Sequence, residues 1–300
     1  VGEDEDNRGW TSGGGRVIGW RNTRQYLETG DAIAAQGWTP FILDTNGNGR
    51  RDADYVEPDQ PVDPSRDKRI NSGFYAVAPA PDGSVWGSNL SYPGAVVRLM
   101  PGDNPSVTAL TEYYELPLDA NGDPIEGFSP RGMDIDRNGV AWVALASGHM
   151  ASFDRSLCQG PLNGPEATGQ HCPEGWTFYA EPLPQFKNID TPGSSEGSYY
   201  TWVDQFDTLG LGENTPINTG NQSGALLALH DGEWVRLRVP YPLGFYTKWM
   251  DGRIDDPNAG WKGRGLWTTF SSRTPFHMET GAGTSSKVYH FQMRPDPLAN

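Results

Sequence analysis

The sequence predicts an all-β protein, a β-propeller whose blades are four-stranded antiparallel sheets. Three observations lead to this prediction. The chain of 300 residues contains 38 Gly, 25 Pro and 11 Trp, a mixture typical of short strands joined by tight turns. A unit made of a polar turn, a Trp-containing strand, a small-residue turn and a second strand recurs five times. The longest helix-like segment, residues 23–37, is interrupted by Gly30.

The recurring units follow one another and predict one propeller domain over residues 1–300. Their approximate bounds are 8–70, 71–127, 128–187, 197–241 and 242–296. Because one blade cannot bury both faces of its sheet, stacking in a ring supplies the core. A β-sandwich is the alternative, but it does not predict the same unit five times. The first unit opens at its second strand, "GWTSGGG", with no innermost strand ahead of it, and five units are few for a closed ring. Either the C-terminus supplies the missing strand, or blades are absent at the N-terminus, for example from a ring of seven blades.

The first unit contains a candidate calcium loop, "LDTNGNGRRDADY" at residues 43–55. Side-chain oxygens occur at every second position, and glycines between them allow a tight bend. This spacing resembles the calcium loops of EF-hands and dockerins, in which positions 1, 3, 5, 7 and 9 supply ligands. The predicted ligands are the side chains of Asp44, Asn46, Asn48 and Asp52 and the backbone carbonyl of Arg50.

The loop departs from an EF-hand at two points. Tyr55 occupies position 12, where an EF-hand has a bidentate Glu, and Asp54 or Glu57 is the candidate substitute. No amphipathic helices flank the loop, so the sequence does not predict a calcium sensor. A solvated, Asx-rich turn is the alternative interpretation. We therefore interpret the loop as a structural calcium site.

The two cysteines, Cys158 and Cys172, bracket a loop rich in Gly, Pro and Asn. A disulfide between them would contribute about 3 kcal/mol for a loop of this length. Zinc is the alternative, with His171 beside Cys172, but a fourth ligand is not evident. The predicted disulfide indicates a periplasmic or secreted protein.

The net charge of −15 excludes a polyanionic partner such as nucleic acid, because no cluster of Lys or Arg offsets it. No run of 18 apolar residues occurs, so no membrane span is predicted. The start of the chain has no signal peptide, which suggests a mature or trimmed chain.

Two segments resemble a known family. "GFYAVAPAPDGSVWGSNLSYPGAVVRL" and "SPRGMDIDRNGVAWVALASGHMASFD" are similar to blades of streptogramin lyase-like (virginiamycin B lyase-like) propellers, and the resemblance is clear over residues 72–156. The whole chain also resembles the C-terminal part of longer exported bacterial proteins with carboxypeptidase-regulatory-like and c-type haem segments. This resemblance implies a c-type haem domain as a partner, although the chain itself contains no C-x-x-C-H.

Candidate ligand residues lie where propeller loops gather around the channel. These are the segments leading into the innermost strands and the turns between second and third strands. The predicted ligand-binding residues are Tyr75, Arg131, Tyr200, Asn214, Tyr246 and Arg273. Aromatic and cationic side chains suit an anionic or aromatic small ligand, whereas each residue alone is equally compatible with an ordinary loop position.

The resemblance also implies lyase chemistry, a C–O elimination that uses a general base and a divalent metal such as Mg²⁺. His149, Glu213 and His277 are the candidate catalytic residues. The family's "WFTE" glutamate is replaced here, by "WGSN" in one unit and "WVAL" in the next. We therefore expect a binding module: an exported, calcium-stabilised propeller that binds a small ligand or protein partner within a redox-associated assembly. A streptogramin lyase-like enzyme is the alternative, so the sequence leaves enzymatic activity open.

Overall fold

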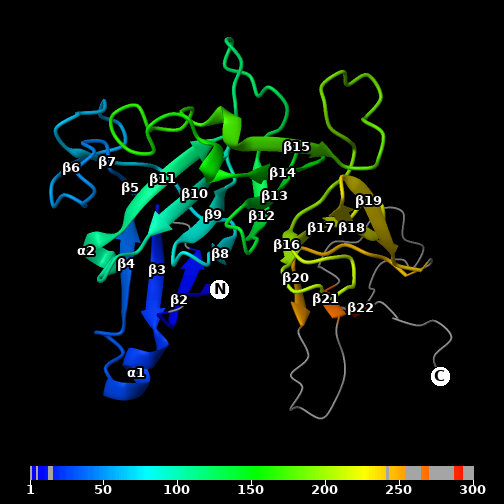
Figure 1. Ribbon diagram of the computed structural model, residues 1–300, viewed down its shortest axis with the longest axis horizontal. Helices are drawn as coiled ribbons and strands as arrows, with labels where there is room; N and C mark the ends of the chain where they lie inside the picture. The colour runs from blue at the N-terminus through cyan, green and yellow to red at the C-terminus, as the bar shows by residue number, and fades with distance from the viewer. Residues whose placement is uncertain are drawn as a thin grey trace.

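The chain folds into five β-sheets that follow one another in chain order. The structure, a computed structural model, describes residues 2–4, 6–12, 16–240, 243–253, 265–269 and 287–292. Figure 1 shows the sheets side by side around an arc, from the blue first sheet to the orange fifth. The predicted all-β propeller fold is confirmed.

Blade 1 contains four strands in simple antiparallel order: β1 (Gly2–Glu3), β2 (Arg8–Ser12), β3 (Val17–Asn22) and β4 (Gln36–Pro40). The expectation that the first unit opens at its second strand is wrong, because β1 pairs with β2 through Gly2 opposite Trp10. Two residues are too few to show strand periodicity in a sequence. Between β3 and β4, the helix α1 (Thr23–Thr29) is capped by Asn22 and ends at Gly30, which has a φ of 69°.

Blade 2 has an extended outer edge. Its own strands are β8 (Val77–Pro79), β9 (Val85–Asn89), β10 (Ala95–Met100) and β11 (Leu110–Glu115). Three short strands continue the sheet beyond β11, in the order β5 (Ile42–Leu43), β7 (Asp67–Arg69) and β6 (Tyr55–Val56). These strands fall within the first predicted unit, yet they join blade 2 because Leu43 pairs in parallel with Thr111. We call residues 41–70 the insert.

Blades 3 and 4 are regular four-stranded sheets, and three strands of blade 5 are described. Blade 3 contains β12 (Pro130–Ile135), β13 (Ala141–Leu145), β14 (His149–Phe153) and β15 (Trp176–Ala180). Blade 4 contains β16 (Thr201–Asp204), β17 (Thr215–Gly220), β18 (Ala225–His230) and β19 (Glu233–Arg238). Blade 5 contains β20 (Met250–Arg253), β21 (Gly265–Thr269) and β22 (Val288–Phe291). The remaining short helices are α2 (Pro105–Thr108), η1 (Arg155–Leu157) and η2 (Pro173–Gly175).

The core lies between neighbouring blades. One buried cluster packs blade 1 on blade 2 around Trp10 and Val97, and a second packs blade 2 on blade 3 around Trp86 and Phe153. A third packs blade 4 on blade 5 around Phe245. The described residues form no such cluster between blades 3 and 4.

The antiparallel connections divide the loops between two edges of the blades. We call one edge the loop face: it carries the segments leading into β8, β12, β16 and β20 and the turns between second and third strands. The opposite edge carries the turns between first and second strands. None of the helices in the described part of the chain is long and apolar enough to cross a membrane.

Candidate functional site

Cationic and aromatic side chains meet on the loop face where blades 3, 4 and 5 adjoin. The guanidinium carbon of Arg131 lies 4.4 Å from the centre of the Tyr199 ring, and the Lys248 ammonium lies 4.6 Å from the same centre. The Tyr246 ring lies 5.8 Å from the Tyr199 ring, centre to centre. We call these four residues the Tyr199 cluster. Cations placed over an aromatic ring are held by its quadrupole, which fixes their position.

The innermost strands place these side chains together. Arg131 is the second residue of β12, whereas Tyr199 and Lys248 each lie two residues before β16 and β20. The Gly132 amide donates to the Tyr199 carbonyl at 2.9 Å, and Arg131 Nη1 donates to the Ser198 carbonyl at 2.7 Å. A Cβ at Gly132 would meet the Tyr200 ring at 2.2 Å, so the two blades approach this closely because position 132 is glycine.

A buried carboxyl group, Glu181, accompanies the cluster. Glu181 directly follows β15 and is 2% exposed. Its Oε1 accepts hydrogen bonds from Ser198 and Asn218, whereas its Oε2 is without a hydrogen-bond partner among the described residues. Burial raises the pKa of Glu181 to about 8, although the two hydrogen bonds and Arg131 act in the opposite direction. The carboxyl group is therefore mostly neutral at pH 7 and does not cancel the charge of Arg131.

The electrostatic result is a local positive charge on an acidic protein. The chain carries a net charge of −15, yet Arg131 and Lys248 share one ring and the neighbouring carboxyl group is protonated. Such an arrangement suits an anionic group.

The structure brings together some of the predicted ligand-binding residues but not others. Arg131 and Tyr246 belong to the Tyr199 cluster. Tyr75 holds the equivalent position in blade 2, two residues before β8, and is 40% exposed. Tyr200 instead packs against the apolar clusters on both sides of it. Arg273 lies outside the described residues.

Asn214 and Glu213 lie at the opposite edge from the loop face. They precede β17, in the turn between the first and second strands, and not in the expected turn between second and third strands. Glu213 forms an ion pair with Arg137 at 2.9 Å, and Asn214 accepts a hydrogen bond from the Arg137 amide at 3.0 Å. The expected position is wrong because "GLGEN" has the composition of either turn. Glu213 and His149 therefore do not share a site.

His149, a candidate catalytic residue, begins β14 with its ring completely buried. Its Nδ1 lies 3.0 Å from Ser147 Oγ, and its Nε2 lies 4.0 Å from Glu126 Oε1. Burial lowers the pKa of His149 to about 4, so the imidazole is neutral at pH 7. His277, the third candidate, lies outside the described residues.

The candidate metal loop folds with its polar side chains turned inward. Asn46 Nδ2 and Asn48 Nδ2 donate to the two carboxylate oxygens of Asp52, at 2.6 and 3.2 Å. The oxygens of Asp44 accept from the amides of Asn48 and Gly49, at 3.0 and 2.9 Å. The backbone bends tightly at Gly47 and Gly49, whose φ values are 72° and 73°.

A third carboxyl group, which the sequence pattern does not reveal, adjoins this loop. Asp67 begins β7 and its Oδ2 accepts from the Asp52 amide at 2.7 Å. Burial raises the pKa of Asp67 to about 6, and the charges of Asp52 and Asp44 act in the same direction. In the part of the chain that the structure describes, no three His, Cys, Asp or Glu side chains form a metal-binding group by themselves. Any metal here would therefore also need amide and backbone oxygens.

The candidate substitutes for the missing position-12 Glu lie elsewhere. Asp54 is 83% exposed and pairs with Arg66 at 3.3 Å. Glu57 is half-exposed and pairs with Arg69 at 3.4 Å. Both carboxylates thus have surface partners of their own.

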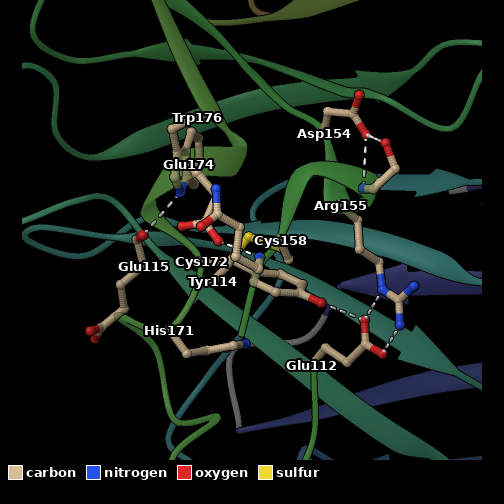
Figure 2. Close-up of a disulfide and its surroundings, with 12 residues drawn as sticks. Glu112, Tyr114, Glu115, Asp154, Arg155, Cys158, His171, Cys172, Glu174 and Trp176 are labelled. Atoms are coloured by element: carbon tan, nitrogen blue, oxygen red, sulfur yellow. Dashed lines mark hydrogen bonds and ion pairs between the residues drawn. A yellow bond between two sulfur atoms is a disulfide. The ribbon is translucent and has the colours of Figure 1, made fainter. Parts of the chain in front are cut away.

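The predicted disulfide between Cys158 and Cys172 is present, with the two Cα atoms 5.0 Å apart. Figure 2 shows it beside the side chains that join blade 3 to blade 2. The zinc alternative does not hold, because both thiols are consumed and the His171 ring lies 5.1 Å from the Tyr114 ring. A disulfide is typical of exported proteins.

Three members of the site, Tyr199, Glu181 and Lys248, were absent from the predicted ligand-binding residues. Glu181 ends the strand-like segment "WTFYAEPL", and Lys248 stands in "FYTKWM", shortly before an innermost strand. The available signal was a charged residue directly beside a buried strand. That signal is weak because most such residues point into solvent.

No protein-family model matches the chain, and no curated protein matches it. Several solved structures, however, are similar to the chain. An inactive variant of virginiamycin B lyase from Staphylococcus aureus, crystallised with quinupristin, is 13% identical with a TM-score of 0.48, over 99% of this chain and 70% of that one. PorZ, a surface component of the type-IX secretion system of Porphyromonas gingivalis, is 15% identical with a TM-score of 0.50. The similarity covers 89% of this chain and 30% of PorZ.

The chain has a β-propeller fold. Its blade topology establishes this, and the similarity to streptogramin lyases is a similarity of fold. At identities of 11 to 13% the lyases carry no information about the chemistry of this chain. The predicted resemblance to streptogramin lyase-like propellers is confirmed as a resemblance of fold.

Proposed function

We propose that this protein is an exported β-propeller that binds an anionic small ligand, or the anionic group of a protein partner, on its loop face. The observation that carries the proposal is the placement of Arg131 and Lys248 over one ring, Tyr199. The disulfide supports export to the periplasm or the cell exterior. The resemblance to longer haem-containing proteins supports a redox-associated assembly as the setting.

Binding is better supported than lyase chemistry. A general base must reach the proton it removes, within about 3.2 Å or through one water. His149 is completely buried, and Glu213 lies at the opposite edge of the blades. Within the described part of the chain, the four residues of the Tyr199 cluster are two cations and two aromatic rings, and none of them is a carboxylate or a histidine.

We further propose that calcium stabilises the insert. Residues 44–52 direct carboxylate and amide groups of Asp44, Asn46, Asn48 and Asp52 toward one another. Calcium would be bound by these groups together with the backbone carbonyl of Arg50, and its contribution would be structural. Calcium removal should therefore lower the melting temperature without abolishing anion binding at the distant loop face.

The test is titration with two defined probes, benzoate and inorganic phosphate, at constant ionic strength and pH 7. Isothermal titration would compare wild type with Arg131→Gln and Lys248→Gln. We expect each substitution to weaken binding by about tenfold, because each removes one charge-assisted contact.

Matched controls separate a site from a general charge effect. Arg236 also donates to a backbone carbonyl across blades 3 and 4, that of Pro182, at 2.9 Å, so Arg236→Gln matches Arg131→Gln. Lys187→Gln removes an exposed lysine elsewhere in the segment that leads into β16. Equal losses in the controls, or no binding of either probe to wild type, would overturn the proposed function.

A further inference from the structure

Asp67 is a completely buried carboxyl group beside the candidate calcium loop, 15 residues beyond Asp52 in the sequence. Its Oδ2 accepts one hydrogen bond, from the Asp52 amide, whereas its Oδ1 has no hydrogen-bond partner in the described part of the protein. A buried carboxylate oxygen without a partner is costly, and most such oxygens are satisfied by a donor or a cation.

The loop directs further oxygens to the same place. Asp52 contacts Asp67 through its backbone and contacts Asn46 and Asn48 through its side chain. Asp44 is also close enough for its charge to act on Asp67. The carboxyl groups of Asp52 and Asp67 and the side-chain amides of Asn46 and Asn48 therefore lie close to one another, with Asp67 contributed by β7.

Nearby cations offset these carboxyl groups only in part: the charge of Arg51 acts on Asp67, but burial and the charges of Asp52 and Asp44 outweigh it. The neighbouring arginine, Arg51, donates away from the loop, to Thr39 and to the Ser106 carbonyl. Arg66 pairs with the exposed Asp54 and Asp63. Like charges held this close in a buried place are stabilised by a bound cation, and hard oxygen ligands select calcium or magnesium.

We propose that Asp67 is the carboxylate that completes a calcium site, in place of the Glu that position 12 of the loop lacks. The proposed ligands are Asp44, Asn46, Asn48, the Arg50 carbonyl, Asp52 and Asp67. The inference rests on the proposed calcium binding and adds to it a ligand from a different strand. An EF-hand draws all of its ligands from one continuous loop, whereas this site needs β7 to be folded against β5.

The site also reaches the disulfide loop of blade 3. Asn163 Nδ2 donates to Asp44 Oδ2 at 3.1 Å, and the Gly164 amide donates to the Asp44 carbonyl at 2.7 Å. Both residues lie within the loop closed by Cys158 and Cys172. A bound ion would thus hold together the insert on blade 2 and the disulfide loop on blade 3.

The decisive experiment measures Ca²⁺ affinity by isothermal titration of the full chain. Asp67→Asn should weaken Ca²⁺ binding at least tenfold. Asp54→Asn and Glu57→Gln are the matched controls, because each removes one insert carboxylate that has its own surface partner. We expect both controls to bind Ca²⁺ within twofold of wild type.

The outcomes separate the two proposals. If wild type binds neither Ca²⁺ nor Mg²⁺, the proposed metal binding itself is wrong. If wild type binds Ca²⁺ and Asp67→Asn binds it equally well, only the role of Asp67 is wrong. A preference for Mg²⁺ over Ca²⁺ would overturn the assignment of the ion.

A second measurement needs no variant, in case Asp67→Asn does not fold. Amide hydrogen exchange of wild type would be compared with Ca²⁺ and with a chelator. Peptides covering residues 44–52, 66–69 and 163–164 should exchange at least severalfold more slowly with Ca²⁺, whereas β18 should not change. Protection confined to residues 44–52 would overturn the inference, because an ordinary single-loop site would then suffice.

Discussion

Two neighbouring interfaces of the propeller, made by the same kind of blade, are built in opposite ways. Between blades 2 and 3, aromatic rings pack at tilted angles in a buried cluster: Phe153 lies 4.5 Å from Tyr114 and 5.1 Å from Trp176, centre to centre. Between blades 3 and 4 the described residues form no aromatic cluster of this kind: Tyr200 packs against apolar residues of blade 3, and hydrogen bonds supply further contacts. Trp234 donates to the Ala180 carbonyl at 2.9 Å, and the Val203 amide donates to Asp134 at 2.9 Å.

The two interfaces also differ in how burial changes the pKa of their carboxyl groups. At the interface of blades 2 and 3, Glu112 accepts two hydrogen bonds of 2.7 Å from Arg155 and one of 2.8 Å from Tyr114 (Figure 2). Arg98 donates a further hydrogen bond to Glu112, at 3.1 Å. Burial alone would raise its pKa, but Arg155 and Arg98 hold the pKa of Glu112 below its ordinary value.

At the interface of blades 3 and 4, burial prevails. It raises the pKa of Glu181 to about 8 and that of Asp134 to about 7. At the interface of blades 2 and 3, the buried charge of Glu112 is therefore compensated by two arginines, which stabilises the fold. The other interface leaves two carboxyl groups close to neutrality, and one of them, Glu181, is near enough to the proposed ligand site for the charge of Arg131 to act on it.

The largest effect that tests this comparison should come from Phe153→Ala. Phe153 is completely buried among aromatic rings, so truncation leaves a cavity at the interface of blades 2 and 3. We expect a loss of about 3 to 5 kcal/mol in the free energy of unfolding. Urea unfolding would measure it, with Trp234→Phe as the control at the other interface, where we expect about 1 kcal/mol. Equal losses would show that the two interfaces do not differ in this way.

A smaller effect should come from Glu112→Gln, which breaks the charge network of the same interface. The substitution leaves Arg155 and Arg98 without their shared carboxylate, and we expect a loss of about 2 to 3 kcal/mol at pH 7. The pKa of Glu112 is lowered by folding, so its contribution is present above the ordinary Glu pKa and is lost as the pH falls through the lower folded value. The difference between wild type and Glu112→Gln should therefore shrink below pH 4. A difference that persists at pH 2 would contradict the charge-based account.

The sequence predicted the blades better than it predicted their interfaces. Strand pairing follows from local patterns, such as the turn and strand around Trp86, and those patterns repeat. The position of Glu213 depended on which of two turns the segment "GLGEN" forms, and short Gly-rich segments fit either. The cluster around Tyr199 joins residues from three blades, so no local pattern contains it.

Long-range contacts also explain what was missed in the metal loop. The spacing of Asp44, Asn46 and Asn48 is visible in one short segment. Asp67 comes next to them only because β5 pairs with β7. Neither strand is long enough to produce a recognisable strand pattern in the sequence. Cys158 and Cys172 were paired correctly because the chain offers no other cysteine.

The smallest and most specific effect should come from Glu181→Gln, measured against pH. The pKa of Glu181 is raised by folding, so its contribution to stability is complete below the ordinary Glu pKa and is lost as the pH rises through about 8. Glu181→Gln cannot ionise. We expect it to be close to wild type in stability at pH 5 and clearly more stable than wild type at pH 9.

Ionisation of Glu181 should also change the affinity of the proposed ligand site. Above pH 8 the Glu181 carboxylate would offset Arg131, so wild type should bind benzoate severalfold more weakly at pH 9 than at pH 7. Glu181→Gln should bind equally at both values, and Glu112→Gln should follow wild type because Glu112 is already ionised at both. If Glu181→Gln still loses affinity between pH 7 and pH 9, the loss belongs to another group, such as Lys248. The interface of blades 3 and 4 would then be polar without acting on the ligand site.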